Sequence, residues 1–281
     1  MARSRVRTTH LPRLTPLLPV LALSAALLLT SACGSPDPAR GTAGDHAAPG
    51  ANGKPVVVAT TTWEAAFAKA AGAEDVTVIV PRSVHHAPDY DPKPSDLAAV
   101  AGADFVLYAP FEPYAAKIKE AAGSKARLVE VNLDNEPGKA AAEVARLGAL
   151  FGTEEAAAHW KTGLDAEVAR LRGELRAAWP GGHSPTVVTQ VFTGWAAGLA
   201  GATTVGTYGP DPVTPAQLAA LSAKKPALVL DNAHMSTGTV LPDSGARQVE
   251  IANYPGEDLD LLAVYRGAAR ELRKGMGGVD G

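Results

Sequence analysis

Two stretches of the chain carry side chains that could hold a metal ion. His85 and His86 are adjacent in a proline-rich segment, and Asp231 is followed three residues later by His234. Neutral imidazole is a ligand for zinc, manganese and iron, and a carboxylate adds the negative charge that favours a divalent cation. Asp231 and His234 share one short loop and could chelate an ion together. The plainer alternatives are a solvated histidine pair in the first stretch and a turn-capping aspartate beside an exposed histidine in the second.

The overall composition excludes several other classes of protein. The 281 residues include 26 basic and 29 acidic side chains, for a formal net charge of -3, so there is no broad basic field for nucleic acid. With 46% hydrophobic and 20% charged residues, the chain is globular rather than disordered. A single cysteine excludes a disulfide framework and a cysteine-rich zinc module. The sequence has no Gly-x-Ser-x-Gly, His-Glu-x-x-His or glycine-rich phosphate motif, which favours a binding protein over an enzyme.

The first residues have the pattern of an export signal. Four arginines precede the almost wholly apolar run Leu14–Leu29, and Thr30-Ser31-Ala32-Cys33 follows. A basic start, a short apolar core and small residues are typical of a secretory signal peptide. Its end resembles the lipidation site of bacterial lipoproteins, which implies that residues 1–32 are removed and that Cys33 is lipidated. The alternative is a plain signal peptide with an incidental cysteine.

Residues 33–54 are predicted to form a flexible tether. Of the 21 residues from Gly34 to Lys54, 13 are Gly, Pro or Ala, and none has a large apolar side chain. Such a segment cannot bury a core. We therefore expect an exported protein held on the outer face of the bacterial cell membrane by a lipid at Cys33. Loss of the arginine-rich signal makes the mature chain more acidic, which suits a cationic ligand.

From Pro55 onward, short apolar runs alternate with helical segments. The run Val56–Thr60 is rich in β-branched residues, as in a strand that is buried on both faces. Strands that alternate with helices indicate a parallel sheet covered by helices on both sides. The predicted strands of this half are 56–60, 76–80, 104–108 and 127–131, and the predicted helices are 63–71, 94–101 and 114–122.

A pair of helices is predicted to connect this half to the next. Residues 138–150 have a helical pattern, which Gly152 interrupts. Thr153 restarts the helix as an N-cap, with two glutamates in the first turn. This second helix continues to about Ala178, a length of roughly 39 Å. Such a length is right for a rod that joins two domains.

The second half repeats the theme of the first. Asp96–Val100 precedes the strand Phe105–Leu107, and the similar stretch Gln217–Leu221 precedes the strand Leu228–Leu230. This internal similarity supports two related lobes. The predicted strands of the second half are 186–191, 227–231 and 248–252, and the predicted helices are 215–221 and 258–274.

The sequence therefore predicts an α/β fold with two doubly wound α/β lobes joined by one long rigid helix. The predicted boundaries are 55–152 for the first lobe, 153–180 for the helix and 181–281 for the second lobe. Ligands of doubly wound sheets bind beyond the carboxyl ends of the strands. The segments with His85, His86 and His234 both follow predicted strands and are expected there.

The segment from Pro81 to Leu97 has the most specific pattern in the chain. It includes Asp89-Tyr90-Asp91-Pro92-Lys93-Pro94-Ser95-Asp96-Leu97, and Ala103-Asp104 precedes the next strand. This pattern resembles the metal-binding solute-binding lipoproteins of ABC transporters, the zinc/manganese type. The resemblance covers nearly the whole mature chain. It implies two α/β lobes bridged by a long helix, with the ligand in the cleft between them.

The resemblance also implies a set of metal ligands. The family typically holds its ion with histidines from the first lobe and an acidic residue that ends a strand of the second. His85 or His86 fits the first histidine, Glu130 falls at the position of the second, and Asp231 fits the acidic residue. His234 lies close enough in sequence to join Asp231. The expected metal site therefore consists of His85, His86, Glu130, Asp231 and His234.

This ligand set departs from the family pattern. Pro88 stands where a histidine directly precedes the acidic residue and the tyrosine, and Glu130 replaces a histidine. Thr189–Phe192, after the first strand of the second lobe, also offers no histidine. The scaffold thus matches better than the ligands do. The chain could bind metal through a different set, bind a chelate, or have lost metal binding.

Aromatic residues are expected near the same cleft. Trp63 and Glu64 follow the first strand, Trp195 follows the first strand of the second lobe, and Tyr90 belongs to the family motif. Such residues are more often part of a core than in contact with a ligand. Aromatic side chains at a cleft are nevertheless what an organic ligand uses.

The expected function is a lipid-anchored, monomeric receptor that captures zinc or manganese, before iron, and delivers it to an ABC transporter permease. The first alternative keeps the scaffold and changes the ligand to a metal chelate, a siderophore or a cobalamin. Further alternatives are an enzyme and an adhesion or accessory lipoprotein that has no ligand. No nucleic-acid partner is expected.

Overall fold

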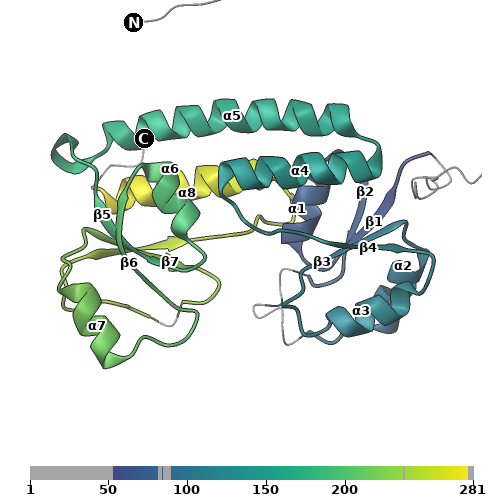
Figure 1. Ribbon diagram of the computed structural model, residues 1–281, viewed down its shortest axis with the longest axis horizontal. Helices are drawn as coiled ribbons and strands as arrows, with labels where there is room; N and C mark the ends of the chain where they lie inside the picture. Colours follow the sequence, from purple (N-terminus) through teal and green to yellow (C-terminus); the bar gives the residue numbers. More distant parts are fainter. Residues whose placement is uncertain (1–52, 82–83, 85–89, 237, 278–281) are drawn as a thin grey trace, which may run out of the picture. The chain divides into compact units, whose positions relative to one another are not determined.

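The computed structural model describes residues 53–81, 84, 90–236 and 238–277 (Figure 1). The predicted signal peptide, Cys33 and most of the predicted tether lie outside the described residues. His85 and His86 also lie outside them. The described residues form two parallel sheets and the helices that cover them.

The first sheet is formed by four parallel strands in the order β2-β1-β3-β4. Its strands are β1 (Val56–Ala59), β2 (Asp75–Val78), β3 (Phe105–Tyr108) and β4 (Arg127–Glu130), and its helices are α1 (Thr62–Ala70), α2 (Pro94–Gly102) and α3 (Ala115–Ala122). Neighbouring side chains of a strand point to opposite faces. Val57 and Phe105 therefore pack on the side of α1, whereas Val58 and Val106 pack with Val100 of α2 on the other side. This burial on both faces explains the unbroken apolar runs of β1 and β3.

The second sheet has the same strand order as the first, β6-β5-β7-β8. Its strands are β5 (Thr186–Gln190), β6 (Thr203–Tyr208), β7 (Leu228–Asn232) and β8 (Arg247–Ile251), and its helices are α6 (Gly194–Ala200), α7 (Pro215–Ser222) and α8 (Leu261–Gly275). Val187 of β5 faces the interior that both lobes share, and Val188 faces the side of α7. The predicted two-lobed α/β class is confirmed.

The sequence did not predict α6 and β6. Helix α6 has two glycines among its seven residues, so it has no strong helical signal. Strand β6 is half exposed, rich in threonine and interrupted by Gly206. A Cβ atom on Gly206 would lie 2.5 Å from the Cδ2 atom of Leu221, so a larger residue there would have to displace the Leu221 side chain of α7. The formation of α6 and β6 therefore depends on tertiary packing more than on the intrinsic helix or strand propensity of their residues.

Two antiparallel helices connect the sheets. Helix α4 (Pro137–Phe151) ends at Gly152, which has a positive φ of 72°, and α5 (Glu154–Ala177) follows. Thr153 occupies the predicted N-cap position, but its hydroxyl makes no capping bond within α5. It donates instead to the carbonyl oxygen of Ala71 at 2.5 Å. The start of α5 is thereby bonded to the end of α1.

Helix α5 extends along both lobes (Figure 1). Its 24 residues have a length of about 36 Å. It packs against α1 and α4 of the first lobe and against α6 and α8 of the second. A single continuous core extends from Phe67 of α1 through Leu164 of α5 to Leu199 of α6 and Tyr265 of α8. The lobes therefore cannot separate without exposing part of this core.

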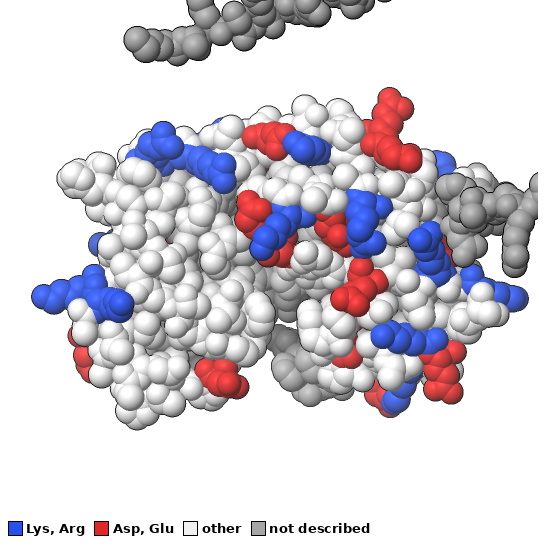
Figure 2. Space-filling model, viewed as in Figure 1, with Lys and Arg blue, Asp and Glu red and all other residues white. Residues whose placement is uncertain are grey.

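The outer face of α5 is charged. Lys161 pairs with Asp165 at 2.6 Å, and Arg170 pairs with Glu174 at 2.5 Å. Figure 2 shows basic and acidic side chains along the edge of the molecule where α5 lies. Such exposed pairs each contribute only about 0.3–0.5 kcal/mol, so the buried face provides most of the stabilisation. Within the described ranges, no helix has both the length and the apolar character needed to cross a membrane.

Substitutions at two neighbouring residues of α5 test whether the lobes share one hydrophobic core. We expect Leu164→Ala to lower the free energy of unfolding by roughly 2–5 kcal/mol, because Leu164 is fully buried. We expect Gly163→Ala to raise it by roughly 0.5–1 kcal/mol, because a Cβ atom there meets open space and alanine favours helix. Urea denaturation followed by circular dichroism and tryptophan fluorescence measures both. Separate transitions for the two lobes would contradict a shared core.

Candidate functional site

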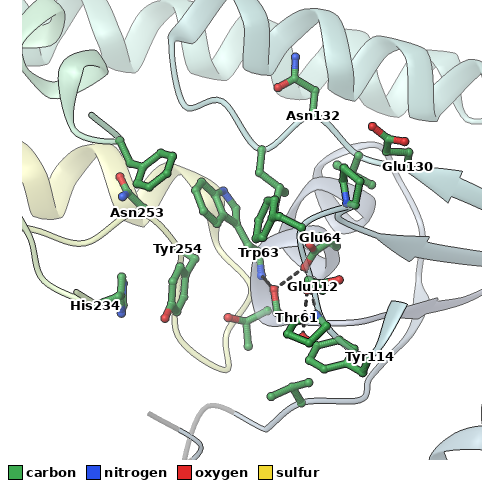
Figure 3. Close-up of a pocket in the computed structure, with 18 of the residues that line it drawn as sticks. Thr61, Trp63, Glu64, Glu112, Tyr114, Glu130, Asn132, His234, Asn253 and Tyr254 are labelled. Carbon is green, nitrogen blue, oxygen red and sulfur yellow. Dashed lines mark hydrogen bonds between the residues drawn. The ribbon is translucent and has the colours of Figure 1, made fainter. Parts of the chain in front are cut away.

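A cavity of about 1040 Å³ lies between the two lobes (Figure 3). The segments that follow β1, β2, β3 and β4 line it from one side, and those that follow β5, β6, β7 and β8 line it from the other. It therefore lies beyond the carboxyl ends of the strands, where doubly wound sheets bind their ligands. Its size is in the range of pockets for small organic molecules.

Aromatic side chains from both lobes line part of the cavity. The rings of Trp63 and Tyr254 have their centroids 5.7 Å apart, and the imidazole of His234 stacks on Tyr254 at 3.5 Å. Figure 3 shows Tyr254 between the other two rings. Phe111 from the first lobe is 73% exposed and Phe192 from the second is 49% exposed. Large exposed apolar side chains from both lobes thus also line the cavity.

Two buried asparagines join the lobes at this cavity. Asn135 follows β4 and Asn253 follows β8, and each is only 1% exposed. The side chain of Asn135 accepts a hydrogen bond from Trp63 Nε1 at 3.2 Å, and that of Asn253 accepts one from Trp195 Nε1 at 2.8 Å. The Nδ2 atom of Asn135 donates to the carbonyl oxygen of Asn253 at 2.6 Å. The hydroxyl of Tyr265 in α8 also donates to the carbonyl oxygen of Asn135, at 3.0 Å.

Two buried glutamates lie on the side of the cavity that the first lobe forms. Glu64 is fully buried, and its Oε2 atom accepts hydrogen bonds from the amide and the hydroxyl of Thr61, which caps α1. Its Oε1 atom is buried and has no hydrogen-bond partner among the described residues. Glu112 is 7% exposed and accepts from the Ala109 amide at 3.0 Å and from the Tyr114 hydroxyl at 3.0 Å.

The pKa values of both carboxyl groups are raised, chiefly by burial. Burial, followed by the negative charge of Glu112, raises the pKa of Glu64 to about 8. Burial likewise raises the pKa of Glu112. Burial and the neighbouring Glu112 raise the pKa of the Tyr114 hydroxyl above its ordinary value. At neutral pH, Glu64 therefore carries a proton when the cavity is empty.

A second acidic group on the cavity has a partner of opposite charge. Glu143 of α4 is bonded to Arg146 of the same helix through Arg146 Nε at 2.9 Å. Arg146 also donates to the carbonyl oxygen of Glu130 at 2.8 Å, which fixes the end of β4. Glu143 additionally accepts from the Asn132 amide at 3.1 Å. All four residues line the cavity.

The structure brings some of the predicted site residues together and separates others. Trp63, Glu64, Glu130 and His234 line the cavity, whereas Tyr90, Trp195 and Asp231 do not. Trp195 is buried against Tyr265, at a centroid distance of 5.4 Å.

Asp231 has its carboxylate satisfied inside the second lobe. It is 3% exposed and accepts hydrogen bonds from Tyr208 Oη at 2.5 Å and from Gln248 Nε2 at 3.2 Å. Its neighbour Asn232 ends β7, and the side chain of Asn232 accepts from the amide of His234 at 3.0 Å. The segment 231–234 therefore directs His234, and not Asp231, to the cavity.

The motif after the histidine pair begins a helix. The Oδ2 atom of Asp96 accepts from the Lys93 amide at 2.8 Å and from the Tyr90 hydroxyl at 2.7 Å. Pro94 occupies the first turn of α2. Asp96 thus bonds the residues that precede α2, and neither Tyr90 nor Asp96 lines the cavity.

Sequence reasoning missed several residues of the cavity. Glu112 and Tyr114 belong to Pro110-Phe111-Glu112-Pro113-Tyr114, directly after β3. An acidic and an aromatic residue between two prolines, followed by a tyrosine, at the carboxyl end of a predicted strand, were the available signal. Tyr254 of the cavity carried no such signal, and neither did Asn135, which accepts the hydrogen bond of Trp63. No group of three or more His, Cys, Asp or Glu side chains that could hold a metal ion occurs within the described residues.

The sequence matches a known protein family. Residues 57–212, more than half of the chain, match the family model described as ZnuA, zinc-uptake complex component A, periplasmic. No curated protein matches the chain significantly in sequence.

Several solved structures share the fold. The laminin-binding protein Lmb of Streptococcus agalactiae, described as an adhesin with metal transporting activity, has a TM-score of 0.58 at 16% identity, over 78% of this chain and 99% of that one. The SBP FpvC of Pseudomonas aeruginosa in complex with Ni²⁺ has a TM-score of 0.60 at 13% identity, over 81% and 99% of the two chains. The metal-dependent lipoprotein YcdH of Bacillus subtilis has a TM-score of 0.53 at 19% identity, over 78% and 100%.

The raised pKa of Glu64 predicts a pH-dependent stability. Between its ordinary value of 4.5 and about 8, the folded chain holds a proton that the unfolded chain releases. The free energy of unfolding should therefore fall with rising pH across this window, by up to roughly 1.4 kcal/mol per pH unit for one proton. Glu64→Gln should flatten this slope.

Urea denaturation at several pH values between about 5 and 8 measures the slope for the wild-type chain and the variant. Glu120→Gln, an exposed change on α3, is the control and should keep the wild-type slope. Equal slopes for Glu64→Gln and the wild-type chain would contradict a buried, protonated Glu64.

Proposed function

Because the chain belongs to the family of periplasmic zinc-uptake components, we propose that it is the extracytoplasmic receptor of an ABC transporter and that its cargo is a divalent metal ion, zinc or manganese before iron. The observation that carries this proposal is the cavity that both lobes line at the carboxyl ends of their strands. The Ni²⁺ ion in the structure of FpvC supports a metal as cargo on this fold. The role is capture and delivery to a permease, not catalysis.

The proposed metal ligands are His85 and His86 from the first lobe and His234 from the second. The histidine pair directly follows Val84, which lines the cavity, and His234 lines it from the opposite lobe. Glu130 also lines the cavity and can add a negative charge. Asp231 is proposed to hold the segment of His234 in place through Tyr208 and Gln248.

Metal titration of the full chain, purified without a histidine tag, tests this proposal. We expect about one zinc ion per chain and a rise in melting temperature, because a ligand at 100 times its Kd stabilises the folded state by about 2.7 kcal/mol. Changing His85, His86 and His234 together to Ala should abolish binding. Changing His159 and His183, which are exposed elsewhere, should leave it intact. Unchanged affinity in the triple variant would refute the ligand assignment.

The size of the cavity favours a second candidate cargo, a metal chelate such as a siderophore or a cobalamin. A bare ion would fill only a small part of about 1040 Å³, and Trp63, Phe111, Phe192 and Tyr254 offer apolar contact to an organic ligand. If no free metal binds and the melting temperature does not change, the chelate becomes the favoured cargo.

We also propose that the protein is a monomer anchored to the outer face of the cell membrane through lipid at Cys33. The apolar run before this cysteine and the small residues beside it support the assignment. Cys33→Ser should therefore release the protein from the membrane fraction into the medium, as immunoblots of the two fractions would show. Unchanged membrane partition of the variant would count against lipidation.

A further inference from the structure

Within the described residues, no lysine or arginine forms an ion pair with Glu64 or Glu112 of the cavity. Three of their four carboxyl oxygens accept hydrogen bonds, all from neutral donors, which are Thr61, Ala109 and Tyr114. The fourth, Glu64 Oε1, is buried without a partner among the described residues. Figure 3 shows Glu112 next to Glu64 in the wall of the cavity.

Glu143 on the same cavity provides the contrast. It has an arginine within bonding distance, since Arg146 Nε lies 2.9 Å from its Oε2 atom. In the described part of the chain, neither Glu64 nor Glu112 has a lysine or arginine at such a distance. A buried carboxylate without a counter-charge is unfavourable, so each of these groups is stabilised either by holding a proton or by pairing with a cation. The cavity beside them is open to a cation from outside, which can take the place of that proton.

We infer that Glu64 and Glu112 form a subsite for the ammonium group of an organic ligand whose apolar body lies against the aromatic walls of the cavity. This inference uses one part of the proposed function, namely that the cavity is where the protein binds its ligand. It names a chemical feature of the ligand that neither a bare metal ion nor a neutral molecule has.

The choice of an ammonium group follows from the donors and the walls. An ammonium offers three hydrogen-bond donors, which the unpartnered Glu64 Oε1 and the remaining lone pairs of Glu112 can accept. Glu64 and Glu112 offer a bare divalent ion only two side chains, whereas such an ion needs about four or more ligands, and no third His, Cys, Asp or Glu joins them among the described residues. Trp63, which directly precedes Glu64, offers its ring face to an apolar body or to the cation itself.

Tryptamine and its neutral analogue tryptophol test the inference. Both carry the same indole, and only tryptamine carries an ammonium at neutral pH. Isothermal titration of the full wild-type chain, with EDTA present to remove metals, should show tryptamine binding at least about tenfold more tightly than tryptophol, the effect of one charge-assisted hydrogen bond. Glu64→Gln and Glu112→Gln should each bring the two affinities close to each other.

Three controls make the result decisive. Glu120→Gln removes an exposed negative charge from α3 and should keep the tenfold preference. Phe111→Ala removes an aromatic wall and should weaken both probes without changing their ratio. Cooperative urea unfolding of each glutamine variant shows that it is folded, and Glu112→Gln leaves the Thr61–Glu64 cap of α1 intact.

Equal affinities of the two probes for the wild-type chain, no binding of either probe, or an unchanged preference in both folded glutamine variants would overturn the inference. The metal titration without tryptamine is a separate measurement. Its failure alongside a preserved tryptamine preference would refute the metal cargo and leave the ammonium subsite standing.

Discussion

The contact between Asn135 and Asn253 holds the two lobes together at the cavity. Each asparagine accepts the indole N–H of a tryptophan from its own lobe, and Asn135 then donates across to the carbonyl oxygen of Asn253. Because these groups are buried, breaking the contact would leave polar atoms unpaired at a cost of about 1–3 kcal/mol each. Together with the core along α5, this contact holds the two lobes in one arrangement on either side of the cavity.

The two lobes share one sheet topology but present different side chains to the cavity. Both sheets have the same strand order, and Trp63 and Trp195 stand in the helices that follow their equivalent first strands. The side chains that reach the cavity have nevertheless diverged. The first lobe supplies Glu64 and Glu112, whereas the second supplies the stacked rings of His234 and Tyr254. Loops at strand ends can change in this way because they lie outside the packed core.

The sequence allowed the scaffold to be predicted better than the site, for physical reasons. Strands such as β3 are buried on both faces and show as apolar runs, whereas β6 and α6 depend on tertiary contacts. Asp231 fits a ligand position by its place at the end of a strand, yet its carboxylate accepts a hydrogen bond from Tyr208 of β6, a strand that β5 separates from β7. Glu112 stands between prolines and has the pattern of an ordinary turn. The roles of Asp231 and Glu112 depend on partners from other strands and loops. The order of residues in the sequence does not show which of these partners will be close in the fold.

The charges on the cavity limit what can bind there. Arg146 neutralises Glu143, and the raised pKa of Glu64 means that a proton neutralises that group in the empty state. A proton can leave when another cation arrives, whereas Arg146 is part of the chain and stays. Of Glu143 and the glutamate pair, only the pair can therefore exchange its positive charge with solvent. An anionic ligand would gain nothing at this pair, so the first lobe favours a positively charged ligand, whether a metal ion or an ammonium group.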